Sequence, residues 1–218
     1  MIRNNLKSLA FVNLLSLFVF TLLLVAVLAH TELIGLDREL SRLVFLYAGA
    51  PFVAVAFFFT RIGDFSSIVL ISSIVVGYFL GKKRFDQVVV LGTTLVSVNI
   101  FVRFMKLAVG RVRPEHGYYI LHDPSFPSGH AAVAAAFFTL VYLLLAKDIK
   151  GKAPRFYLAV SFLSLATFVG FSRVVLNVHW LSDVVAGLFL GVFFGTLGYA
   201  VFLLESGAVK KLKVHHKK

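Results

Sequence analysis

Long apolar segments make up most of the chain, and short charged segments separate them. Apolar runs of about 18 or more residues are long enough to cross the hydrocarbon core of a bilayer. The backbone must satisfy its own hydrogen bonds there, which favours helices, and these runs lack the alternating polarity of barrel strands. We therefore predict an all-α polytopic membrane protein, a six-transmembrane-helix bundle whose spans are residues 9–29, 64–81, 87–109, 129–147, 156–176 and 183–204.

The segment after the first span has a different pattern. Apolar residues recur at helical spacing between charged residues in the stretch 36–44. This spacing predicts a short amphipathic helix lying at the membrane interface. The apolar stretch 44–60 that overlaps it is interrupted by Gly49 and Pro51, and we expect it either to dip into the bilayer or to extend the second span.

Composition and charge narrow the class further. The chain has 218 residues, is 59% hydrophobic, lacks cysteine and carries a formal net charge of +12. One membrane domain, residues 1–218, accounts for the whole length, and disulfide or thiolate chemistry is excluded. The cations gather at the N-terminus, in residues 82–86 and 147–155, and in the C-terminal tail, which is the positive-inside pattern and not a nucleic-acid surface. We expect an inner-membrane protein with both termini cytoplasmic.

Three polar clusters lie in the loops that alternate with these basic segments, so we expect them on the extracytoplasmic face. Ionisable groups beside membrane-length apolar segments are costly, and each is a functional-site hypothesis by default. The clusters are Lys106-x6-Arg113-Pro114, Pro127-Ser128-Gly129-His130 and Ser172-Arg173-x5-His179-x3-Asp183.

The third cluster contains a candidate nucleophile. His179 and Asp183 are four residues apart, so on a helix they share a face. A carboxylate bonded to one imidazole nitrogen fixes the tautomer and leaves the other nitrogen free to attack. Arg173 offers a fork-shaped partner for phosphate oxygens. In isolation, a His-x3-Asp pair is more often structural.

The second cluster predicts an anion site at the start of the fourth span. Ser128 is expected to cap that helix, and Gly129 allows a ligand to approach the backbone. Free N–H groups at a helix N-terminus bind anions, and His130 in the first turn would face one. A plain N-cap beside a surface histidine is the alternative for this motif by itself.

The cations of the first cluster also have two interpretations. Lys106 and Arg113 could hold a phosphate or could anchor the third span at the headgroups. For Arg103 and Arg111, headgroup anchoring is the expectation.

Together the three clusters resemble the signature of the type 2 phosphatidic acid phosphatase family, whose members share a fold core with vanadium-dependent haloperoxidases. Every position of K-x6-RP, PSGH and SR-x5-H-x3-D is matched. The resemblance implies that His179 forms a phosphohistidine, that Asp183 orients it, and that His130 protonates the leaving oxygen and then activates water. It also implies that no metal or other cofactor is needed and that the phosphate is held by Lys106, Arg113, Ser128, Gly129 and Arg173.

The resemblance therefore implies an integral membrane lipid phosphatase that hydrolyses a phosphate monoester or pyrophosphate of a membrane lipid. The short loop over the site favours an isoprenoid or glycerolipid phosphate over a bulky soluble substrate. The motif does not separate these lipids; polyprenyl pyrophosphate is placed first, and phosphatidylglycerol phosphate or phosphatidic acid second. A lipid A phosphatase and a lipid phosphotransferase are alternatives. A haloperoxidase is disfavoured because those relatives are soluble, and a non-catalytic lipid-binding protein because both histidines and the aspartate are present. The expected partners are the lipid substrate and the bilayer; the oligomeric state is left open.

The remaining polar and small residues are assigned structural roles. We expect helix packing from a ladder of glycines, a bundle-facing position for the polar residues of the third span, and interface, helix-end or solvated positions for the rest. The ladder is Gly187, Gly191 and Gly195, and the polar span residues are Thr93, Thr94, Ser97 and Asn99. His116, His122 and Asp123 are expected to be solvated loop residues, with metal binding as the alternative. Arg61 and Asp64 are expected to anchor helix ends, with a place on the rim of the cleft as the alternative. Tyr118 and Tyr119 are expected to mark the interface belt, and Trp180 is either a belt residue or a lid.

Overall fold

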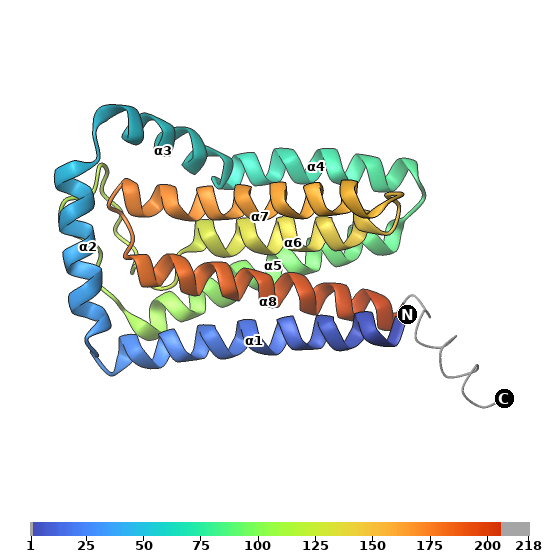
Figure 1. Cartoon of the computed structure of the whole chain (residues 1–218), viewed down its shortest axis with the longest axis horizontal. Helices are drawn as coiled ribbons and strands as arrows, with labels where there is room; N and C mark the ends of the chain where they lie inside the picture. Colours follow the sequence, from blue (N-terminus) through green and yellow to red (C-terminus); the bar gives the residue numbers. More distant parts are fainter. Residues whose placement is uncertain (1, 206–218) are drawn as a thin grey trace.

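The computed structural model describes residues 2–205, so the basic C-terminal tail, whose location was predicted as cytoplasmic, lies outside the described residues. Within 2–205 the secondary structure is helical, without strands, which confirms the predicted all-α fold (Figure 1). The eight helices of this range are α1 (Ile2–Leu28), α2 (Leu33–Tyr47), α3 (Ala50–Ile62), α4 (Phe65–Gly81), α5 (Phe85–Val109), α6 (Gly129–Ala146), α7 (Lys152–Val175) and α8 (Leu181–Glu205).

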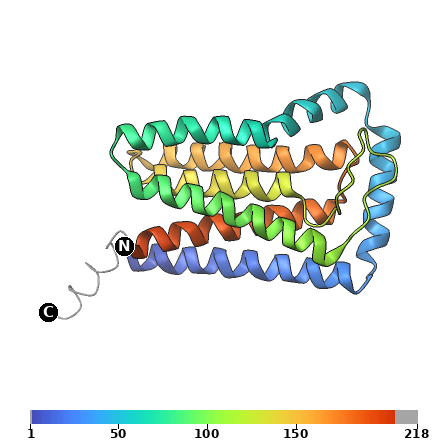
Figure 2. The same ribbon diagram turned by 180° about the vertical axis from the view of Figure 1, so that it is seen from behind.

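The predicted spans correspond to α1 and to α4 through α8. Five of these helices are long and apolar enough to cross a membrane, and α4 is a shorter apolar helix. The ambiguous stretch 44–60 is divided between α2 and α3, which are bent by 116° relative to each other. The helix α2 lies across one end of the bundle, and α3 then runs back along α7 and leads into α4 (Figures 1 and 2). The amphipathic helix after the first span is therefore confirmed as α2.

The helix α6 is the centre of the bundle, between α7 and α8 (Figure 1). Its first turns are rich in alanine, and five of these alanines are buried, which allows neighbouring backbones to come close. The glycine ladder of α8 packs on this surface as predicted. A Cβ atom at Gly191 would lie 2.3 Å from the carbonyl oxygen of Ala132, and one at Gly187 would lie 2.5 Å from that of Ser128. Only glycine permits this approach, which brings the start of α6 beside the start of α8.

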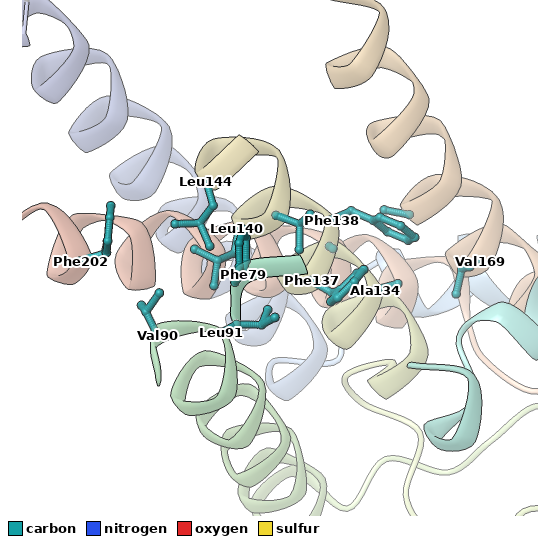
Figure 3. Packing of buried hydrophobic residues seen from close by; sticks show 13 residues of the cluster. Phe79, Val90, Leu91, Ala134, Phe137, Phe138, Leu140, Leu144, Val169 and Phe202 are labelled. Atoms are coloured by element: carbon teal, nitrogen blue, oxygen red, sulfur yellow. The ribbon is translucent and has the colours of Figure 1, made fainter. Parts of the chain in front are cut away.

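A hydrophobic cluster holds five of the helices together (Figure 3). Aromatic and aliphatic side chains from α4, α5, α6, α7 and α8 meet there, among them Phe79, Leu91, Phe137, Leu140 and Phe202. The third predicted span, α5, contributes less polar surface to the interior than expected. Thr94 is buried against α8, but Thr93 and Ser97 are exposed, and the Thr93 hydroxyl donates to Val89 O at 2.9 Å within its own helix.

Candidate active site

All three polar motifs meet at the end of the bundle that α2 crosses. Lys106 lies in the last turn of α5, Ser128 at the N-cap of α6, Arg173 in the last turn of α7 and Asp183 in the first turn of α8. The basic segments 82–86 and 147–155 connect helices at the opposite end (Figure 1). The alternation of motif loops and basic loops in the sequence is thus a separation between the two ends of the fold.

Backbone geometry at two helix ends shapes this site. The helix α5 ends at Gly110, which adopts a left-handed conformation with φ 63° and donates its N–H to Lys106 O at 2.9 Å. The predicted break before Pro114 is confirmed, and the chain from there to Ser128 lies over the site. Between α7 and α8, the Asn177 side chain accepts from Ser41 Oγ at 2.5 Å and donates to His116 O at 3.2 Å. These bonds attach the turn before His179 to α2 and to the loop above it.

His179 and Asp183 form a buried pair. The imidazole Nδ1 lies 3.4 Å from Asp183 Oδ2, and the two side chains are 2% and 0% exposed. The same carboxylate oxygen accepts the backbone N–H of Trp180 at 3.1 Å. The predicted contact between the two side chains is present, but they do not share a helix face, because His179 lies before α8 begins.

Arg113 identifies the free nitrogen of His179. Its Nη1 lies 3.1 Å from His179 Nε2 and donates to Val178 O at 2.6 Å. A guanidinium can only donate, so Nε2 carries the lone pair and the Nδ1 proton faces Asp183. Burial first, and then the positive charges of Arg113, Arg173 and Lys106, hold the pKa of His179 well below its ordinary value. The imidazole is therefore neutral and has a lone pair directed toward cations, as a nucleophile for an anionic centre requires.

Lys106 and Arg113 share one carboxylate. Lys106 Nζ lies 2.6 Å from Asp123 Oδ2, and Arg113 Nη2 lies 3.0 Å from Asp123 Oδ1. Burial alone would raise the pKa of Asp123, but the bonds and charges of the two cations lower it to about 2. Asp123 was predicted to be a solvated loop residue. It is half-exposed, yet it fixes the spacing of two phosphate-binding candidates.

Arg173 is almost fully buried and is oriented by hydroxyl groups. Its Nη1 donates to Thr60 Oγ1 at 2.6 Å and to the Tyr119 hydroxyl, and its guanidinium carbon lies 5.3 Å from the centre of the Tyr119 ring. Tyr119, which was predicted to mark the interface belt, packs on this arginine. The Arg173 Nε atom is buried and has no hydrogen-bond partner within the protein.

Ser128 occupies the predicted N-cap of α6, but it does not cap through its side chain. Its hydroxyl makes no capping bond, and its Oγ is a second buried polar atom without a protein partner. Its backbone N–H donates to Asp183 O at 3.0 Å, which ties the α6 terminus to the His179–Asp183 pair. Gly129 begins α6 directly after it. The side chain of Ser128 is therefore available to a ligand and is not used by its own helix.

His130 has a carboxylate partner that sequence reasoning missed. Its Nε2 lies 2.9 Å from Asp64 Oδ1, at the junction between α3 and α4. Gly63 makes this approach possible, since a Cβ atom there would lie 2.5 Å from Val169 Cγ1 and 3.0 Å from His130 Cδ2. Asp64 lies at a helix end as expected, as the N-cap residue of α4, and its side chain also contacts His130 of the site. A glycine and an aspartate at a helix junction were the signal available in the sequence, and it was weak.

Arg111 also differs from its prediction. It was expected to anchor the chain at the headgroups, but its side chain is only 9% exposed. Its Nη1 lies 2.6 Å from Asp183 Oδ1, and its Nη2 lies 2.8 Å from Asp37 Oδ2, a residue of α2. Two roles were open for Trp180. Its ring centre lies 5.6 Å from the guanidinium carbon of Arg111, and its Nε1–H donates to Val112 O at 2.7 Å.

At the end of the bundle that holds the motifs, cationic side chains and hydroxyl groups surround the imidazole of His179. Among residues 2–205 no three His, Cys, Asp or Glu side chains gather as ligands for a metal ion. Lys106, Arg113 and Arg173 all act electrostatically on His179. Preorganised positive charge of this kind stabilises the negative charge that develops during phosphoryl transfer.

Comparison with known proteins assigns the family. The profile of the PAP2 superfamily matches residues 87–205, more than half of the chain. The chain belongs to the PAP2 superfamily. The helical bundle described above is therefore the fold of a PAP2 membrane protein.

Relatives of this PAP2 protein include several named phosphatases. It is 29% identical to phosphatidylglycerophosphatase B of Bacillus subtilis, over 91% of this chain and 95% of that protein. It is 25% identical to the undecaprenyl-diphosphatase of Sulfolobus acidocaldarius, over 92% of this chain and 94% of that protein. It also matches two lipid A 1-phosphatases from Rhizobium at 34% identity, and there it spans about half of their length.

A solved structure extends the likeness to three dimensions. The transmembrane PAP2-type phosphatidylglycerolphosphate phosphatase from Bacillus subtilis superposes with a TM-score of 0.78 at 25% identity. The match covers 85% of this chain and 94% of that one. The likeness therefore includes the helices before the family region as well as those within it.

Proposed function

We propose that this PAP2 protein is an integral membrane lipid phosphatase that works through a phosphohistidine on His179. The observation that carries the proposal is the position of His179 Nε2. This lone-pair nitrogen lies 3.1 Å from Arg113 Nη1, while Nδ1 faces the buried Asp183 carboxylate. A neutral imidazole held this way can attack phosphorus, and Asp183 stabilises the positive charge that the ring then gains.

The proposed reaction has two steps. In the first, His179 Nε2 bonds to phosphorus, the bond to the leaving oxygen breaks, and His130 donates a proton to that oxygen. In the second, His130 takes a proton from water, the water oxygen bonds to phosphorus, and the N–P bond breaks to release phosphate. Asp64 accepts from one nitrogen of His130, which leaves the other for these transfers. General acid–base help of this kind contributes roughly 10²–10⁴ in rate.

Five groups are proposed to hold the phosphoryl oxygens: Lys106, Arg113, Arg173, the Ser128 hydroxyl and the backbone at Gly129. Support comes from two buried atoms, Ser128 Oγ and Arg173 Nε, which find no partner within the protein. Buried polar atoms rarely stay unpaired, and phosphoryl oxygens would accept from both.

For the substrate, we propose a lipid phosphate monoester or pyrophosphate drawn from the bilayer. The two full-length relatives named above act, by their names, on phosphatidylglycerophosphate and on undecaprenyl diphosphate. These are the two substrates favoured from the sequence. The higher identity and the structural likeness support phosphatidylglycerol phosphate as the first to test, ahead of the polyprenyl pyrophosphate that the sequence placed first.

For the topology, we propose an inner-membrane protein with the site on the extracytoplasmic face and the basic loops in the cytoplasm. The chain lacks cysteine, so single cysteines can be placed at exposed loop positions without background. A His122→Cys variant should react with a membrane-impermeant maleimide in intact cells, and a Lys150→Cys variant only after lysis. The reverse labelling pattern would place the site in the cytoplasm.

The activity is tested by phosphate release from the purified protein. The panel contains phosphatidylglycerol phosphate, a polyprenyl pyrophosphate, phosphatidic acid and lipid A, with wild type beside His179→Ala. His122→Ala, an exposed histidine of the loop above the site, is the matched control. We expect a preferred lipid whose hydrolysis is lost in His179→Ala and kept in His122→Ala.

A trapping experiment tests the intermediate. Labelled substrate should leave an acid-labile, base-stable phosphate on wild type, none on His179→Ala, and more on His130→Ala, because the second step then slows. Equal phosphate release by wild type and His179→Ala would overturn the mechanism.

A further inference from the structure

A buried ionic chain lies behind the His179–Asp183 pair. Arg111 bridges two aspartates, with Nη1 at 2.6 Å from Asp183 Oδ1 and Nη2 at 2.8 Å from Asp37 Oδ2. The side chains of Asp37, Arg111 and Asp183 are 3%, 9% and 0% exposed. Buried charges cost several kcal/mol each unless they are paired in good geometry, and removing one partner leaves the other uncompensated. Each member of this chain therefore needs its neighbour.

Asp37 also holds the start of α8. Its Oδ1 accepts the backbone N–H of Ser182 at 3.0 Å, and its Oδ2 accepts the Ser182 hydroxyl at 2.5 Å. An aspartate at a helix N-terminus satisfies free N–H groups and complements the helix dipole. The residue comes from α2, so a helix that crosses the end of the bundle caps the helix that carries Asp183 (Figure 1).

The two oxygens of Asp183 have different partners: one faces Arg111 and the other faces His179. Oδ1 accepts from Arg111 Nη1, and Oδ2 faces His179 Nδ1 and the Trp180 backbone. Turning the carboxylate to a different angle would break bonds on both sides. Arg111 therefore sets the direction in which Asp183 presents Oδ2 to the imidazole.

Charge gives Arg111 a second effect. Without it, Asp37 and Asp183 would be two buried carboxylates that lack the cation now between them. Only an ionised Asp183 stabilises the imidazolium character that His179 gains when it attacks. No signature motif includes Asp37 or Arg111 as a defined position.

We propose that Arg111 and Asp37 are positioning residues of the phosphatase site, which keep Asp183 ionised and directed at His179. They act through Asp183 and touch neither the substrate nor the reacting atoms. The inference rests on the proposed function. It adds that the position of α2 across the end of the bundle determines the orientation of His179.

The test compares the buried ionic chain with an exposed pair on the same helix. Arg111→Gln and Asp37→Asn are measured beside Arg42→Gln and Glu39→Gln, which alter a surface ion pair of α2 at 2.7 Å. We expect kcat for phosphate release to fall about tenfold or more in Arg111→Gln and by a smaller factor in Asp37→Asn, with KM within about twofold. The two surface variants should match wild type, and Arg111→Lys should recover part of the loss.

A double-mutant comparison separates positioning from a general structural role. If Arg111 acts through Asp183, Arg111→Gln should change kcat by less than about twofold in an Asp183→Asn background. The full loss in that background, or no loss in the wild-type background, would overturn the inference. Unfolding temperatures in detergent identify any variant that fails to fold. If Arg111→Gln does not fold, kcat is compared in Arg111→Lys and Asp37→Asn instead.

A measurement without turnover keeps the inference distinct from the proposed function. Nitrogen-15 NMR of the His179 ring should report a proton on Nδ1 in wild type and a mixture of tautomers in Arg111→Gln. Equal phosphate release by wild type and His179→Ala would reject the function alone. An unchanged His179 tautomer in Arg111→Gln would reject the positioning role whether or not the protein is active.

Discussion

His130 Nε2 lies 2.9 Å from Asp64 Oδ1, so both histidines of the site have a carboxylate on one ring nitrogen. The two pairs differ in exposure. Asp183 is fully buried behind His179, whereas Asp64 keeps 47% of its side-chain surface exposed. The buried carboxylate suits a fixed nucleophile, and the exposed one suits a histidine that exchanges protons with water during the second step.

This relationship predicts a defect confined to proton transfer. Asp64→Asn should lower kcat by about tenfold, because His130 loses the group that orients it, while KM changes little. Glu115→Gln, an exposed carboxylate in the loop above the site, is the control and should behave as wild type. Labelled phosphohistidine should accumulate in Asp64→Asn; a lower level than in wild type would show that the first step is the one affected.

The contact between α6 and α8 predicts a stability effect at a glycine. Gly191→Ala should destabilise the protein by about 1–3 kcal/mol, because the new Cβ would lie 2.3 Å from Ala132 O. Gly92→Ala in α5 is the matched control, since a Cβ there meets nothing within 4 Å. Thermal unfolding in detergent should show a lower midpoint for the first variant only. Equal midpoints would mean that α6 and α8 separate without cost.

The lowered pKa of Asp123 predicts how phosphate release depends on pH. Its pKa of about 2 lies below the ordinary value, so its stabilising contribution is present above pH ~4 and is lost only as pH falls through about 2. Between pH ~5 and ~8 the bonds to Lys106 and Arg113 should therefore persist. Asp123→Asn should lower kcat/KM by a similar factor throughout this range, and phosphate release measured against pH checks it. A ratio of wild type to variant that disappears near pH 5 would show that the carboxylate titrates there instead.

Chelation provides a further prediction. In the proposed mechanism, Lys106, Arg113 and Arg173 supply the positive charge that a metal ion supplies in other phosphoryl-transfer sites. Phosphate release should be unchanged after dialysis against EDTA and assay in its presence. Activity that disappears with chelator and returns with Mg²⁺ would show that these cations are not sufficient.

Much of the fold and the position of the motifs could be predicted from the sequence. Span length and the basic loops gave the bundle and its two ends, because bilayer thickness and charge asymmetry act on continuous stretches of sequence. The glycine ladder of α8 was also readable, since residues four apart share a helix face. The close approach of the α8 backbone to α6 at Gly191 lies on that face.

The partners of the site were not readable, because they depend on how distant elements fold onto it. Asp37 looked like part of the polar face of an amphipathic helix, and only the crossing of α2 over the bundle buries it against Arg111. Asp64 looked like a helix-end residue until the α3–α4 junction brought it to His130. Asp123 belongs to a loop whose path no periodicity describes. In each case a carboxylate outside the motifs determines the environment of a residue at the site.

The origin of these carboxylates bears on where the functional unit begins. The region matched by the family, residues 87–205, contains every signature residue together with Arg111. It contains neither Asp37 nor Asp64, which reach Arg111 and His130 from α2 and from the α3–α4 junction. A chain trimmed to that region would keep the entire signature, and yet Arg111 would lose one of its two aspartates and His130 would lose its carboxylate partner. The boundary drawn by sequence similarity therefore cuts through the network of charges on which the signature depends, and grafts or chimaeras of this site should carry the first 64 residues with it.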